Sequence, residues 1–167
     1  VFLNKNGVQL KENENFYLKL ADSVNVSIDS NISFSLIGID PRSTMQKSIN
    51  NYGCYEPLMV KKILKNVRET DIVYDIGAHI GYYSSIFNKL TKSKQVVSLE
   101  PDFYSTNLIK RNTNARGIVV NKFIGSKLGY NTTTLNDLSS MLNLEPSVIK
   151  MDIEGFEVEA FEGGWEI

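Results

Sequence analysis

The stretch "IVYDIGAHIGYYS", residues 72–84, decides the fold. An apolar run stops at Asp75, glycines follow at Gly77 and Gly81, and apolar and aromatic residues then resume. A buried strand that turns through glycines into a helix is typical of the first strand-to-helix turn of an open parallel sheet, where ligands bind beyond the carboxyl ends of the strands. We therefore expect a strand, a ligand-binding turn and a helix in this order.

The rest of the chain repeats this alternation. Short apolar runs at residues 72–74, 96–99, 118–123 and 148–153 alternate with stretches of helical period at residues 82–90, 103–114, 135–142 and 156–161. Strands that alternate with helices at this spacing predict right-handed βαβ units. The expected fold class is therefore α/β, with a Rossmann-like parallel sheet and helices on both of its faces.

The sequence before this region has a different pattern. Apolar residues alternate over residues 16–37 and are interrupted by Asp29-Ser30-Asn31, which predicts short antiparallel strands joined by a turn. Ser43 and Gln46 resemble a capping box that opens a short helix, and a second helix is expected at residues 56–67. We expect an N-terminal β segment with its linker at residues 1–47 and the Rossmann-like domain at residues 48–167.

Composition restricts the choice of partners. A formal net charge of -1 over 167 residues gives no overall reason to bind nucleic acid or an anionic membrane, so we expect neither as a partner, although a local basic patch stays open. Cys54 is the single cysteine, which excludes an intrachain disulfide and suits a reducing cytoplasm. The chain has no apolar run of about 18 residues and no signal-peptide layout, so we expect a soluble cytoplasmic protein.

The glycine turn and the strand after it suggest the kind of ligand. Gly77 can adopt positive φ and lets a ligand approach the backbone, and Gly81 permits close helix packing. A pyrophosphate-binding signature would have glycine at Asp75, where an aspartate instead repels phosphate and attracts a cation. Glu100 follows 25 residues later, near the spacing of about 20 at which an acidic residue binds ribose hydroxyls. S-adenosylmethionine fits this pattern, whereas NAD fits poorly.

Three ordered segments carry a family resemblance. "YDIGAHIGYYS", "VVSLEPD" and "IKMDIEGFE" together resemble class I S-adenosylmethionine-dependent methyltransferases. The last segment, preceded by "TTLNDL", and the upstream "YGCYEP" resemble the FkbM group of that class. The resemblance covers about residues 48–164. It implies an enzyme that uses S-adenosylmethionine to methylate a hydroxyl of a small molecule or glycan.

The resemblance also implies site residues. For the cofactor these are Asp75, Gly77, Ala78, His79, Gly81, Tyr82, Glu100, Pro101, Asp102, Phe103, Gly125, Ser126 and Asp152. For catalysis they are Asp152, Glu154 and Glu157, with Asp152 orienting or deprotonating the acceptor hydroxyl. Related sequences usually carry asparagine at His79, so we expect this histidine to hydrogen-bond the turn or the cofactor rather than to act as a base.

The carboxylates after residue 151 allow other interpretations. Glu154 and Glu157 begin a predicted helix and can simply stabilise its N-terminus. Together with Asp152 they could hold a divalent cation, but their spacing carries no specific metal signal and we predict no metal.

The expected sheet is incomplete, and this leaves other functions open. Class I methyltransferases usually have seven strands, of which the motifs here account for four, so the C-terminal strands appear missing. We expect a fragment of a longer protein; alternatively, the N-terminal strands or another chain cover the exposed edge, and a homo-oligomer remains open. A non-catalytic or partner-completed cofactor-binding module is the main functional alternative. A nucleic-acid methyltransferase and an NAD enzyme are less favoured.

Overall fold

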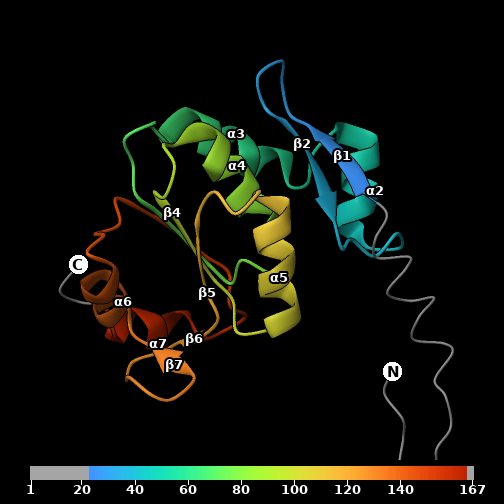
Figure 1. Cartoon of the computed structure of the whole chain (residues 1–167). Coiled ribbons are helices and arrows are strands. Elements are labelled where there is room, and N and C mark those ends of the chain that lie inside the picture. Colours follow the sequence, from blue (N-terminus) through green and yellow to red (C-terminus); the bar gives the residue numbers. More distant parts are fainter. Residues whose placement is uncertain (1–22, 165–167) are drawn as a thin grey trace, which may run out of the picture. The chain divides into compact units, whose positions relative to one another are not determined.

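The computed structural model of the chain describes residues 23–164 (Figure 1), which form two compact units that divide between Glu56 and Pro57. The part of the predicted N-terminal strands at residues 16–22 lies outside the described residues. The domain boundary expected after residue 47 stays a prediction. Each unit is described by itself below.

The first unit contains a hairpin and a helix. Its elements are β1 (Ser23–Ser27), β2 (Ser33–Ile37) and α2 (Thr44–Tyr52), and β1 pairs with β2 in antiparallel fashion. The Asp29 carboxylate forms the turn by accepting the backbone N–H groups of Asn31 at 2.7 Å and Ile32 at 2.9 Å. Ser43 caps α2 as expected, since its hydroxyl accepts the Gln46 N–H at 3.1 Å.

The second unit contains the parallel sheet. Its elements are α3 (Pro57–Asn66), β3 (Val73–Ile76), α4 (Tyr82–Leu90), β4 (Val96–Leu99), α5 (Phe103–Asn112), β5 (Ile118–Val120), β6 (Phe123–Ile124), β7 (Thr132–Thr133), α6 (Leu135–Leu142), β8 (Val148–Met151) and α7 (Glu157–Glu162). Four strands run parallel in the order β5-β4-β3-β8. This order confirms the predicted Rossmann-like α/β fold and the short N-terminal antiparallel segment. It also places a topological switch point beside β3, where ligands bind in open α/β sheets.

The boundaries of α3, α5 and α7 differ from the sequence-based expectation by one or two residues, and three of the apolar runs behave differently as strands. β3 continues to Ile76, so Asp75 lies inside the strand rather than in the turn. The run at residues 118–123 is divided between β5 and β6, and β6 pairs in parallel with β7, a strand too short to predict. The run at residues 148–153 leaves the sheet after Met151.

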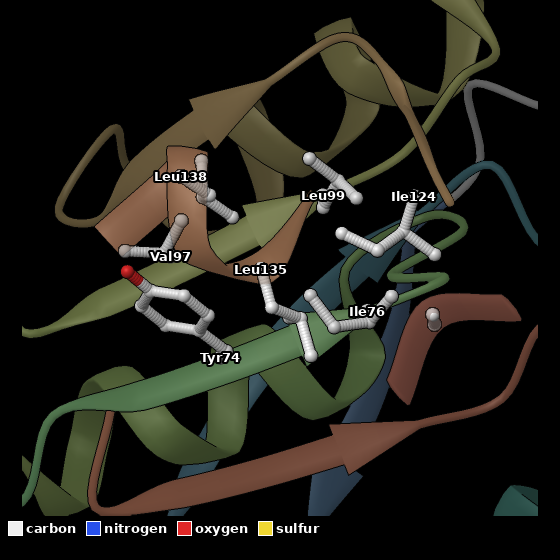
Figure 2. Packing of buried hydrophobic residues seen from close by; sticks show 8 residues of the cluster. Tyr74, Ile76, Val97, Leu99, Ile124, Leu135 and Leu138 are labelled. Carbon is white, nitrogen blue, oxygen red and sulfur yellow. The ribbon is translucent and has the colours of Figure 1, made fainter. Parts of the chain in front are cut away.

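The two faces of the sheet bury different side chains. Figure 2 shows one face, which packs against α6, α7 and β6 through Tyr74, Ile76, Val97, Leu99, Ile124, Leu135, Leu138 and Ala160. Successive side chains of a strand point to opposite faces. Val73 and Asp75 therefore point to the other face, on which α4 contacts both β3 and β4. The helices thus lie on both faces, as predicted.

Two further features bear on the predictions. Within residues 23–164, β8 pairs with β3 alone, so it forms one edge of the four-stranded sheet. Among the same residues, no helix combines the length and the apolar character that crossing a bilayer requires.

Candidate functional site

The turn after β3 packs between the carboxyl ends of β4 and β8. The backbone N–H groups of Gly77 and Ala78 both donate to the carbonyl of Leu99, at 3.0 and 3.1 Å. Gly77 has φ 73°, and a Cβ there would lie 2.1 Å from the carbonyl oxygen of Asp152. Only glycine fits this position, because both the backbone conformation and the close strand exclude a side chain.

Two more residues of the turn have left-handed backbone. Gly81 has φ 84° and begins α4, and a Cβ there would lie 3.1 Å from the Cα of Ile109 in α5. Its close packing is therefore against a neighbouring helix rather than the sheet. His79 has φ 51°, which Asn, Asp and His tolerate better than most residues. This conformation gives a physical reason for histidine at a position where the resembling sequences carry asparagine.

The Glu100 carboxylate joins this turn to the next one. Its Oε2 accepts the backbone N–H of His79 at 2.8 Å, and its Oε1 accepts the backbone N–H of Asp102 at 3.0 Å. The residue follows β4 directly and is only 9% exposed. A carboxylate has about four acceptor positions, so two positions remain for a ligand's hydroxyl groups. The carboxylate is thus held in one orientation before any ligand binds.

Asp75 lies below the turn in a closed polar cluster. Its side chain is 0% exposed, and its Oδ2 accepts the Ser84 hydroxyl at 2.6 Å. Ser98 in turn donates to the Ser84 hydroxyl at 2.8 Å. Burial raises the pKa of Asp75, and the positive charge of Lys150 together with the Ser84 hydrogen bond opposes that rise. The carboxylate therefore has its charge partner within the chain.

That partner, Lys150, is the site residue that the sequence analysis missed. Its Nζ lies 3.5 Å from Asp75 Oδ1, 3.9 Å from Asp152 Oδ2 and 3.5 Å from the Gly77 carbonyl oxygen. It also stands over the Tyr83 ring, 5.0 Å from its centroid. The sequence shows that Lys150 interrupts the apolar run of β8, and the register of the sheet adds that this position pairs with Asp75.

The residues expected around the adenine lie in two places, at the start of α5 and beside the end of α7. Asp102 caps α5 by accepting the Ser105 N–H at 2.7 Å, and this hydrogen bond lowers the pKa of Asp102. Phe103 begins α5 and is 72% exposed. A Cβ on Gly163 would lie 2.4 Å from the Gly125 carbonyl oxygen and 3.3 Å from Ser126 Cα, so these two residues lie beside the end of α7. No hydrogen bond described within residues 23–164 links Gly125 or Ser126 to the glycine turn.

Two predicted cofactor residues, Tyr82 and Pro101, make contacts that also stabilise the fold. Tyr82 is 2% exposed, and its ring meets that of Tyr83 edge to face with centroids 5.0 Å apart. Pro101 is partly buried, and its carbonyl accepts the Asn121 amide at 2.8 Å. The Asn121 amide also reaches the Glu100 carbonyl at 3.0 Å, which fixes the chain at the end of β4.

The predicted catalytic carboxylates surround the end of β8. The Asp152 N–H donates to the Ile76 carbonyl at 3.1 Å, which places this residue beside the glycine turn, while its side chain is 70% exposed. Glu157 accepts the Gly155 N–H at 2.9 Å, a local contact at the start of α7, and Glu154 is exposed. Within residues 23–164, no group of three or more His, Cys, Asp or Glu side chains is placed to hold a metal ion. The catalytic and cofactor roles stay predictions.

Comparison with known proteins finds likeness in structure only. No family model and no curated protein matches the sequence. A dimethyladenosine transferase from Plasmodium falciparum is 18% identical with a TM-score of 0.38, and the match covers 53% of this chain and 35% of that one. M. jannaschii TYW2, in complex with AdoMet, is 16% identical with a TM-score of 0.38, covering 65% and 53%. The M. jannaschii tRNA m1G37 methyltransferase is 14% identical with a TM-score of 0.37, covering 74% and 38%.

These likenesses concern the fold, and the match spans about a third to a half of each of those chains. They do correct one expectation, that nucleic acid is excluded as a partner. One of the three similar proteins is a tRNA methyltransferase, and this finding contradicts the expectation.

Proposed function

We propose that the second unit binds S-adenosylmethionine and transfers its methyl group to a hydroxyl of a small molecule or glycan, as an FkbM-like methyltransferase. The observation that carries the proposal is the Glu100 carboxylate, which two backbone N–H groups hold at the carboxyl end of β4, one strand from β3 and its switch point. A fixed carboxylate at this place suits the two hydroxyls of a ribose. The acceptor rests on the resemblance of "IKMDIEGFE" to the FkbM group.

The glycine turn supports the same proposal. Gly77 presents backbone without a side chain at the carboxyl end of β3, and Glu100 lies one strand away. The residues that would hold the nucleoside are therefore Gly77, Ala78, His79 and Glu100. When bound, the cofactor supplies an electrophilic methyl group for in-line displacement.

Asp152 is the residue proposed to act on the acceptor. In methyl transfer a carbon–oxygen bond forms as the carbon–sulfur bond breaks, S-adenosylhomocysteine leaves, and the hydroxyl proton must go to a base. The Asp152 carboxylate is exposed beside the glycine turn, and Lys150 lies 3.9 Å from it. It could orient the hydroxyl and accept this proton, while Lys150 restricts its position.

The test is calorimetric titration of the folded chain with S-adenosylmethionine, S-adenosylhomocysteine and NAD. We expect the first two to bind and NAD to bind far more weakly. Glu100→Gln removes the charge and one of the two acceptor oxygens, and losing one charge-assisted hydrogen bond worth about 1.5–3 kcal/mol predicts about 10- to 150-fold weaker binding. Glu145→Gln is the matched control, because Glu145 is an exposed glutamate before β8. A folded sample that binds neither S-adenosyl compound refutes the proposal.

A non-catalytic cofactor-binding module is the second candidate. Within residues 23–164 β8 is an edge strand that another chain could extend. The 70% exposure of the Asp152 side chain also favours the module, since methyl transfer benefits from a site closed to water. The two candidates separate when labelled S-adenosylmethionine is incubated with pools of glycans, small-molecule alcohols and RNA. Binding without formation of S-adenosylhomocysteine in any pool favours the module, and label in the RNA identifies nucleic acid as the acceptor.

The cytoplasm is the compartment we propose. Cys54 is buried and unpaired, which is compatible with a reducing environment. Labelling of cell fractions with an antibody against the chain tests this point.

A further inference from the structure

Basic side chains gather at the end of the sheet opposite to the glycine turn. Four of them lie on the turns that precede β3, β4 and β5 and are exposed: Arg68, Lys92, Lys94 and Arg116, which we call the basic edge. The last turns of α3, α4 and α5 add Lys65, Lys89, Lys110 and Arg111. α4 and α5 follow parallel strands and run back along them, and α3 leads into the start of β3, so the three helix ends lie at the same end of the sheet.

Hydrogen bonds hold the turns of the basic edge together. The Lys92 N–H donates to the Glu69 carbonyl at 3.2 Å, and the Lys94 N–H donates to the Arg116 carbonyl at 3.1 Å. The Arg116 guanidinium reaches the Thr91 carbonyl at 3.4 Å. Because β3, β4 and β5 are neighbours in the sheet, their preceding turns form a row with strands about 4.8 Å apart. The four cations therefore lie on neighbouring turns that hydrogen bonds connect to one another.

Acidic residues do not neutralise this surface. None of the ion pairs formed within residues 23–164 uses a residue of the basic edge. The acidic residues on the adjoining turns are Glu69, Asp71 and Glu145, which are three carboxylates against the eight cations of the turns and helix ends. Cations at helix C-termini stabilise the helices. This explains the four basic residues in the last turns of α3, α4 and α5, but it does not explain the four of the basic edge.

The charges of the unit are thus separated between its two ends. The end with the glycine turn carries Asp75, Glu100, Asp102, Asp152, Glu154 and Glu157, with two lysines, Lys150 in β8 and Lys122 after β5. A net charge of -1 for the chain conceals this separation. Local potential rather than net charge decides where a polyanion binds.

We propose that the basic edge binds nucleic acid through its phosphate backbone, away from the proposed cofactor site and independently of it. Phosphate contacts by Lys and Arg give affinity without sequence specificity. An anionic membrane is the less suitable partner, because surface-binding elements combine cations with exposed apolar side chains. The large exposed apolar side chains of the described residues, from Tyr52 to Phe161, all lie outside the turns at residues 68–71, 91–95 and 113–117.

The experiment measures fluorescence anisotropy of a labelled single-stranded 20-nucleotide RNA of mixed sequence between 50 and 200 mM salt. Four phosphate contacts at a slope of about -0.7 each predict a slope of about -2.8, or about 50-fold weaker binding across this range. Lys92→Gln/Lys94→Gln should halve the slope, so that its affinity falls only about 7-fold over the same range. The matched control is Lys47→Gln/Lys127→Gln, which removes the same charge from exposed positions on other elements.

The proposal is supported if the control variant keeps the wild-type slope and the basic-edge variant shows half of it. RNA binding should also be unchanged in saturating S-adenosylmethionine. Equal slopes in the two double variants, with circular dichroism showing both to be folded, would overturn it. So would the absence of RNA binding at 50 mM salt, whether or not the chain binds vesicles that contain phosphatidylserine. Failure of S-adenosylmethionine to bind would refute the proposed function and leave this inference standing.

Discussion

Replacing Lys150 by methionine tests whether this lysine stabilises the buried carboxylate of Asp75. Methionine keeps the unbranched apolar part of the side chain and removes the ammonium group, whose Nζ lies 3.5 Å from Asp75 Oδ1. Asp75 keeps the Ser84 hydrogen bond of 2.6 Å but loses its charge partner. We expect Lys150→Met to lower the free energy of unfolding at neutral pH.

The size of this loss follows from the burial of the pair. Removing one member of a buried ion pair costs about 3–5 kcal/mol, because the other charge is left without compensation. The Lys150 side chain retains 15% exposure, and water can partly replace it. The bond from Ser84 also continues to stabilise the carboxylate. We therefore expect a loss of about 2–3 kcal/mol in urea denaturation at pH 7.

The pH dependence gives the prediction a second, independent readout. The pKa of Asp75 in the folded chain is raised above the ordinary value of 3.8 by burial. A group whose folded pKa is raised favours the folded state at low pH, and this stability is lost as pH rises from the unfolded pKa through the folded one. Lys150 opposes the rise, so its removal should make the loss larger and extend it to higher pH. The difference between variant and wild type should therefore shrink as the pH is lowered.

Asp75→Asn combined with Lys150→Met is the control. Asparagine is nearly the same size as aspartate and still accepts the Ser84 hydroxyl, but it carries no charge. The double variant should recover more than half of the stability that Lys150→Met loses and should lack the added pH dependence. A single variant as stable as wild type at pH 7, or a double variant no better than the single one, would show that the pair does not stabilise the fold.

Two further substitutions test the backbone of the site and the core. Gly77→Ala combines φ 73° with a Cβ that would lie 2.1 Å from the Asp152 carbonyl, so it should lower the free energy of unfolding by about 3 kcal/mol or more. Gly155→Ala has φ 98° but nothing within 4 Å of the new Cβ, so it should lower the free energy of unfolding by only about 1–2 kcal/mol. Equal losses in urea denaturation would contradict this difference. Tyr74→Phe removes the 2.6 Å hydrogen bond to the Leu144 carbonyl and should lower the free energy of unfolding by about 1–2 kcal/mol in urea denaturation. A stability within 0.3 kcal/mol of wild type, roughly the error of such data, would show that water replaces the bond.

The parallel sheet could be predicted because its signals are local and repeated. β4, α4 and α6 begin and end at the predicted residues, since each apolar run is bounded by polar or turn-forming residues. β6 and β7 could not be predicted, because strands of two residues carry no period. The end of β3 was placed too early because a charged residue was taken as a stop signal. Asp75 instead continues the strand as a fully buried residue.

The candidate site was predictable in its positions but not in its charges. Sequence spacing placed Gly77 and Glu100 at the ends of neighbouring strands, and the register of β3 and β4 agrees with this. The contact between Lys150 and Asp75 depends on β8 lying beside β3, which joins residues 75 positions apart. Such a pair becomes visible only when the strand order is combined with the alternation of side chains between the two faces.

This pairing changes the reason for preferring S-adenosylmethionine to NAD. The sequence-based reason was that Asp75 presents a negative charge to the ligand, yet this carboxylate is fully buried and has Lys150 beside it. A neutralised pair neither attracts a sulfonium nor repels a phosphate strongly. Glu100 alone does not select between the two ligands, because any ribose could satisfy it, so the preference for S-adenosylmethionine rests on the resemblance of the three motifs to class I methyltransferases. Weak discrimination between S-adenosylmethionine and S-adenosylhomocysteine follows, because the positive charge that distinguishes them meets no uncompensated partner at Asp75.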